Sequence, residues 1–89
     1  MSSFEAAVAY VRDLPPDSNG VVSDDERLQL YGLFKRASVG VADPANRPGL
    51  LDFVGRAKFD AWHAQHELEL DEAKARYVAK VHELRARHE

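Results

Sequence analysis

The 89-residue sequence contains no cysteine. This absence excludes a disulfide framework, a thiol nucleophile and a cysteine-ligated zinc site. No apolar run approaches the ~20 residues that a membrane-spanning helix requires. The N-terminus has no basic leader followed by an unbroken apolar stretch, so we expect no signal peptide. We therefore expect a cytoplasmic protein whose residues 1–89 form one domain.

The motifs of common catalytic and phosphate-binding sites are also missing. Neither GxGxxG nor GxxxxGK[ST] occurs, so any phosphate must be held by side chains. No serine, histidine and aspartate are spaced as a nucleophile with its base. His63 and His66 lie three residues apart, but no third well-placed ligand accompanies them. We therefore expect no bound metal, and a protein that is not an enzyme.

Positive charge is unevenly distributed. The net charge is −3, but residues 27–58 carry six basic and two acidic residues, a net +4, which leaves −7 on the rest of the chain. An acidic protein with a basic middle is a poor general nucleic-acid binder and a fair candidate for binding one compact anion. Chance clustering of solvated side chains is the alternative. We expect no nucleic-acid partner, because the second predicted helix opens with three acids.

Two capping boxes mark the starts of two helices. In the first, Glu5 follows Ser2 by three residues, and the helix should end near residue 14, before the turn-rich segment PPDSNG. In the second, Glu26 follows Ser23, and the helix should run from about residue 24 to about residue 37. A connection of ~12 residues without periodicity follows, which is long enough to cross the molecule or to carry function.

The chain from Leu51 to its C-terminus has helical periodicity throughout. One uninterrupted helix and two antiparallel helices broken near residues 67–69 are both compatible with local propensity. Burial favours the break, because a helix of ~35 residues in so small a chain would leave half of its apolar stripe uncovered. The sequence therefore predicts four helices and no strand.

Two pairs of residues place an ammonium group and an aromatic ring on one helical stripe. Tyr31 and Lys35 are four residues apart, and so are Lys58 and Trp62. If the second and third helices pack together, both lysines would converge beside Tyr31 and bind a phosphate through charge-assisted hydrogen bonds. The alternative is two solvated lysines and a Trp62 that belongs to the core. Aromatic residues that would stack on a flat ring are Tyr31, Phe34, Phe59, Trp62 and Tyr77.

Three segments, YGLFKRASVG, RPGLLDFVGRAKFDAW and ARYVAKV, resemble motifs of the acyl-CoA-binding protein family. The similarity extends from Phe4 to about Leu84, in the family's order and near its spacing. It implies an all-α, up-down-down-up four-helix bundle with a bowl-shaped site, and a break after about residue 65. It also implies a monomeric carrier and buffer of medium- or long-chain fatty acyl-CoA, without a cofactor, that delivers its ligand to acyl-CoA-using enzymes or contacts membranes transiently.

The resemblance also assigns roles to eight residues. Tyr31, Lys35 and Lys58 stand where the family holds the ribose 3′-phosphate of coenzyme A. Arg12 stands where the family usually has a lysine on its first helix. The resemblance implies that Phe34 and Tyr77 line the adenine and acyl side of the pocket, and that Leu28 and Ala57 touch the buried acyl chain.

Several positions depart from the family pattern. Phe34 stands in place of a frequent tyrosine, Phe59 in place of a tryptophan, and Val54 in place of a lysine. Glu69 is a poor helix cap where the family has a capping serine. These departures motivate an alternative function, a helical protein-interaction module that keeps the fold and has lost ligand binding.

Overall fold

The computed structural model describes residues 2–14 and 22–88. Its elements are α1 (Ser3–Arg12), α2 (Asp24–Ser38), a 3₁₀ turn η2 (Pro44–Asn46), α3 (Phe53–His63) and α4 (Leu70–His88). The predicted turn-rich segment of residues 15–20 lies outside the described residues. None of the helices in the described ranges has both the length and the apolar character to cross a membrane.

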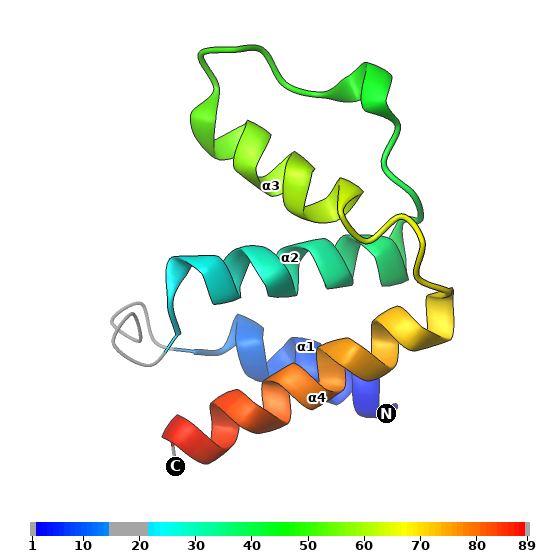
Figure 1. Ribbon diagram of the computed structural model, residues 1–89. Helices are drawn as coiled ribbons and strands as arrows, with labels where there is room; N and C mark the ends of the chain where they lie inside the picture. Colours follow the sequence, from blue (N-terminus) through cyan, green and yellow to red (C-terminus); the bar gives the residue numbers. More distant parts are fainter. Residues whose placement is uncertain (1, 15–21, 89) are drawn as a thin grey trace.

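The four helices form an up-down-down-up bundle (Figure 1). α1 runs opposite to α2, α2 and α3 run in the same direction, and α4 returns alongside α1. α2 is the central element, because it packs against α3 on one side and α4 on the other. The all-α architecture implied by the family resemblance is confirmed.

The predicted capping residues start α1 and α2. Ser2 Oγ accepts the backbone N–H of Glu5 at 3.1 Å. Ser23 Oγ accepts the N–H of Glu26 at 3.1 Å, and the Glu26 carboxylate accepts the N–H of Ser23 at 3.2 Å. α1 ends at Arg12 rather than near residue 14, whereas α2 extends one residue beyond the prediction.

The predicted interruption between α3 and α4 is present, and the alternative of one long helix is wrong. α3 ends at His63 and α4 begins at Leu70, with turns between them. Arg36 of α2 donates from Nε to the carbonyl oxygen of Leu68 at 2.9 Å. The Leu68 side chain packs against the hydrophobic core. The turn is therefore fixed by contacts with α2, which local propensity does not contain.

α3 begins two residues later than Leu51, where the helical periodicity starts. The Asp52 carboxylate accepts the backbone N–H of Gly55 at 2.9 Å and so caps the helix. An aspartate before an apolar run is a favourable N-cap. Asp52 therefore marks the start of α3 in the sequence, which the helical periodicity alone does not locate.

The core is formed mainly between α2 and α4. Leu30 and Leu33 are buried there, and Val81 and Leu84 are about 1% exposed. Tyr77 lies among them at 3% exposure. On the other side of α2, Phe59 is buried, whereas Trp62 is only half-buried and so is not a fully buried core residue.

α2 and α3 approach each other closely at Gly32. A Cβ atom on this residue would overlap the carbonyl oxygen and carbon of Ala61 in α3. The absence of a side chain is therefore what allows the two backbones to meet. The close approach at Gly32 therefore brings Tyr31 and Lys35 of α2 near the side chains of α3.

A group of ion pairs joins the start of α2 to the C-terminal half of α4. Glu26 accepts from Lys80 Nζ at 2.8 Å and from both terminal nitrogens of Arg87, at 2.9 and 2.7 Å. Glu26 is largely covered, with a side-chain exposure of 17%. The hydrogen bonds from Arg87 and Lys80 hold the pKa of the Glu26 carboxyl well below its ordinary value.

The Glu26 ion pairs predict a pH-dependent contribution to stability. A depressed pKa in the folded chain stabilises it above the ordinary pKa of 4.5, and this contribution disappears as pH falls below that value. Glu26→Gln keeps a capping-box side chain but removes the charge. Its melting temperature should be lower than that of the unchanged chain near pH 7, and the difference should shrink progressively below pH 4.5.

Thermal unfolding followed by circular dichroism at several pH values measures this difference. Glu72→Gln is the matched control, because Glu72 pairs with Arg76 on the surface at 3.6 Å with half of its side chain exposed. Exposed ion pairs of this kind contribute little to the free energy of unfolding. An equal effect of the two substitutions at pH 7 would contradict the assignment.

Candidate functional site

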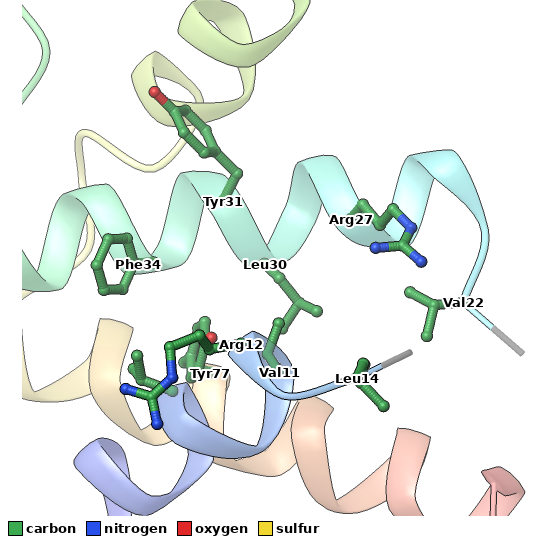
Figure 2. A pocket seen from close by; sticks show the side chains of 10 residues that line it. Val11, Arg12, Leu14, Val22, Arg27, Leu30, Tyr31, Phe34 and Tyr77 are labelled. Carbon is green, nitrogen blue, oxygen red and sulfur yellow. The ribbon is translucent and has the colours of Figure 1, made fainter. Parts of the chain in front are cut away.

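Two adjoining hollows lie along α2. The first, here called the α1–α2 hollow, has a volume of about 290 Å³ and is walled by α1, α2 and α4 (Figure 2). Most of its lining is aliphatic or aromatic. Four of the predicted site residues line it: Arg12, Tyr31, Phe34 and Tyr77.

Aromatic rings form one wall of the α1–α2 hollow. Phe34 and Tyr77 line the hollow, with ring centroids 6.4 Å apart. Phe4 does not line it but packs against both rings, 6.4 Å from Phe34 and edge-on to Tyr77 at 5.3 Å. Burial raises the pKa of the Tyr77 phenol. The wall therefore offers a neutral aromatic surface on which a planar group or a hydrocarbon can pack.

The second hollow, here called the α2–α3 hollow, has a volume of about 520 Å³. The predicted site residues that line it are Leu28, Tyr31, Ala57 and Lys58. Phe53 and Val54 extend its wall at the start of α3 while remaining 76% and 68% exposed. Since Val54 adds apolar surface where the family often has a lysine, this hollow is more apolar than the family pattern implies.

Tyr31 and Arg27 line both hollows. In Figure 2 the Tyr31 ring points away from Leu30, and its hydroxyl group points toward α3. The two side chains therefore form the boundary between the α1–α2 hollow and the α2–α3 hollow. A ligand that occupies both must pass them.

The two lysines of the predicted site lie on aromatic rings of the opposite helix. Lys58 of α3 has its Nζ 5.6 Å from the centroid of the Tyr31 ring in α2. Lys35 of α2 has its Nζ 4.8 Å from the centroid of the Trp62 ring in α3. Lys58 therefore lies beside Tyr31. Lys35, which follows Tyr31 by one turn of α2, lies over Trp62 instead. Within the described residues, neither ammonium group forms an ion pair with a carboxylate.

Three arginines of the basic segment 27–58 bind carboxylate or carbonyl oxygens of neighbouring segments. Arg47 forms two hydrogen bonds with the Asp60 carboxylate, at 3.0 and 2.8 Å, which lower the pKa of Asp60 and raise that of Arg47. Arg56 donates to the carbonyl oxygen of Pro48 at 2.9 Å, and Arg36 to that of Leu68. Arg27 and Lys35 lie on α2 and Lys58 lies on α3, and Arg27 also interacts within the chain.

His63 and His66 stack on each other, with ring centroids 5.1 Å apart. Across residues 2–14 and 22–88, no group of three or more histidine, aspartate or glutamate residues is arranged as a set of metal ligands. Phe59 stacks on the other side of His63 at 6.3 Å. His66 Nδ1 also lies 2.9 Å from the carbonyl oxygen of His63, and its Nε2 lies 3.8 Å from the Glu67 carboxylate.

Arg27 and Phe53 are lining residues that the sequence analysis did not assign. Arg27 precedes Tyr31 by four residues and so shares its helical stripe. Phe53 similarly precedes Ala57 by four residues. Extending each predicted stripe by one turn toward the helix start would have identified both.

The fold agrees with comparisons to known proteins. Residues 1–81 match the family model described as "Acyl CoA binding protein". A Manduca sexta protein, "Acyl-CoA-binding protein homolog", is 52% identical over 81 residues, which cover 91% of this chain and 86% of the relative. A Drosophila melanogaster protein of the same description is 45% identical over 85 residues, covering 96% and 93% of the two chains.

A solved structure supports the same assignment. The crystal structure of Oryza sativa Acyl-CoA-Binding Protein 2 superposes with a TM-score of 0.81 at 36% identity, covering 94% of this chain and 88% of that one. The chain therefore belongs to the acyl-CoA-binding protein family, and the resemblance seen in the sequence is confirmed.

Proposed function

We propose that this chain binds medium- or long-chain fatty acyl-CoA esters and acts as their carrier and buffer, without catalysing a reaction. The observation that carries the proposal is the pair of lysines on aromatic rings at α2 and α3, next to two largely apolar hollows that share Tyr31. The relatives named for acyl-CoA binding support the ligand class.

The ligand's chemistry matches this combination. An acyl-CoA joins a multiply charged head to a hydrocarbon tail, so it needs a basic polar region beside an apolar one. Tyr31, Lys35 and Lys58 would hold the 3′-phosphate through charge-assisted hydrogen bonds. Burying ~10 methylene groups would contribute about 8 kcal/mol at ~0.8 kcal/mol each, before the costs of association.

The two hollows suggest how the rest of the ligand is arranged. The aromatic wall that includes Phe34 and Tyr77 suits the adenine side, and Arg12 adds a cation at the same hollow. Leu28 and Ala57 in the α2–α3 hollow suit the acyl chain. Phe34 cannot donate the hydrogen bond of the family's frequent tyrosine, which would cost about 1 kcal/mol if that bond is normally made.

The proposal includes a setting for this activity. Residues 1–89 act as one domain and as a cytoplasmic monomer that exchanges acyl-CoA with acyl-CoA-using enzymes and transiently with membranes. No cofactor is needed, because binding involves no covalent step. Family membership and the two hollows favour ligand binding over a protein-interaction module that has lost its ligand.

Calorimetric titration with palmitoyl-CoA, dephospho-palmitoyl-CoA and free palmitate tests this function. Palmitoyl-CoA should bind most tightly, and loss of the 3′-phosphate should weaken binding by about tenfold or more, because charge-assisted hydrogen bonds are lost. Free palmitate should bind most weakly. Equal binding of all three would refute the phosphate role. No binding of palmitoyl-CoA by a chain with an intact helical circular dichroism spectrum would support the interaction-module alternative.

A further inference from the structure

Trp62 is the only tryptophan of the chain, and its orientation is fixed by three contacts. The indole Nε1–H donates to the carbonyl oxygen of Gly40 at 2.7 Å. Phe59 meets the ring edge-on, with centroids 6.0 Å apart. The ammonium group of Lys35 lies 4.8 Å from the ring centroid. Trp62 therefore connects the segment after α2 to one of the two lysines of the proposed site.

The hydrogen bond from Trp62 depends on the backbone conformation of Gly40. Its φ angle is +125°, a region that residues with a side chain rarely adopt. A Cβ atom at Gly40 would meet nothing within 4 Å, so glycine is required by the backbone angle and not by lack of space. This conformation directs the Gly40 carbonyl toward the Trp62 indole.

The Trp62 ring restricts a side chain that is otherwise flexible. A lysine ammonium group ends a flexible four-carbon stem and carries three N–H donors. The electron-rich face of tryptophan attracts the charge from one side. Donors on the other side of the nitrogen still face outward, so the ammonium group can bind an anion without leaving the ring.

We propose that Trp62 is a positioning residue for phosphate recognition: its ring face holds Lys35 in place, and the Gly40 carbonyl holds the ring. This inference rests on the proposed function, since it concerns the same anion site. It assigns Trp62 a role through Lys35 rather than direct contact with the ligand. The role depends on the electrons of the ring face, which can be altered without changing the shape of the side chain.

Fluorinated tryptophan provides the test. Because Trp62 is the only tryptophan in the sequence, a fluorinated analogue incorporated in place of tryptophan changes this residue alone. Mono-, di- and trifluorotryptophan progressively weaken the attraction of the ring face for a cation and leave the indole N–H in place. The dissociation constant for palmitoyl-CoA should rise stepwise, by about three- to tenfold for the most fluorinated ring. That for dephospho-palmitoyl-CoA should stay the same.

The same titrations in a Lys35→Ala background separate positioning from a structural role. If Trp62 acts through Lys35, fluorination should no longer change palmitoyl-CoA binding in this background. The inference would be overturned if fluorination left the dissociation constant for palmitoyl-CoA unchanged in the chain that keeps Lys35. It would also be overturned if fluorination weakened binding equally in that chain and in the Lys35→Ala chain. The proposed function would survive either result, provided that the unsubstituted chain still prefers palmitoyl-CoA to its dephospho form. Absence of that preference would overturn both.

Discussion

Lys58→Ala should weaken palmitoyl-CoA binding by about 10- to 100-fold, and Lys35→Ala should have an effect of similar size, because each removes a charge-assisted hydrogen bond worth ~1.5–3 kcal/mol. Both ammonium groups lie on aromatic faces at α2 and α3 and form no ion pair in the described parts of the chain. Removing either one therefore takes away anion binding without leaving a carboxylate unpaired. Stability should change little.

Lys74→Ala is the matched control for the lysine substitutions. Its Nζ also lies over an aromatic ring, 5.7 Å from the centroid of Phe4, but on α4 and outside the two hollows. We expect palmitoyl-CoA binding within about twofold of the unchanged chain, as for a solvated lysine with little electrostatic influence at the site. Binding of dephospho-palmitoyl-CoA should also be nearly unaffected by Lys58→Ala. Equal losses for Lys74→Ala and Lys58→Ala would indicate a general charge effect and contradict a specific phosphate site.

Gly32→Ala should lower the free energy of unfolding by about 2 kcal/mol or more, since overpacking of close contacts typically costs 1–3 kcal/mol. The added Cβ would overlap backbone atoms of Ala61, which cannot rotate away as a side chain would. α2 and α3 must then move apart. On an exposed helix the same change would be stabilising by ~1 kcal/mol. The sign of the effect is therefore diagnostic of the close approach.

Urea unfolding followed by circular dichroism measures this effect. Gly49→Ala is the control, because a Cβ atom there meets nothing within 4 Å and the backbone has no positive φ angle. We expect a change within ~0.5 kcal/mol for this substitution. Gly32→Ala should also weaken palmitoyl-CoA binding, since Tyr31 lies next to Gly32. A Gly32→Ala chain as stable as the unchanged one would show that the helices do not meet at this point.

The helix starts could be predicted because their signals are local. Ser2 with Glu5 and Ser23 with Glu26 satisfy N–H groups within a single turn, so their spacing in the sequence fixes the geometry. The break before α4 depends on Leu68 and on its bond from Arg36, 32 residues away. Periodicity alone left this point open, and only the requirement to bury apolar surface favoured the break.

The candidate site was predictable as a set of residues but not as an arrangement. The spacing of Tyr31 with Lys35, and of Lys58 with Trp62, correctly placed each pair on a stripe of its helix. Which ammonium group meets which ring depends on how far α2 and α3 are offset, which is determined by their contact at Gly32. The division of the lining residues between two hollows likewise depends on packing around α2.

The boundary formed by Tyr31 and Arg27 has a consequence for ligand exchange. Both hollows are open to solvent and meet at these two side chains, so an amphiphile can settle sideways across the boundary instead of threading through a tunnel. Among residues 2–14 and 22–88, departure then requires no helix to unwind and no segment to swing aside. The lifetime of the complex should be set by desolvation of the tail and by the strength of the phosphate contacts, which favours rapid handover of the ligand.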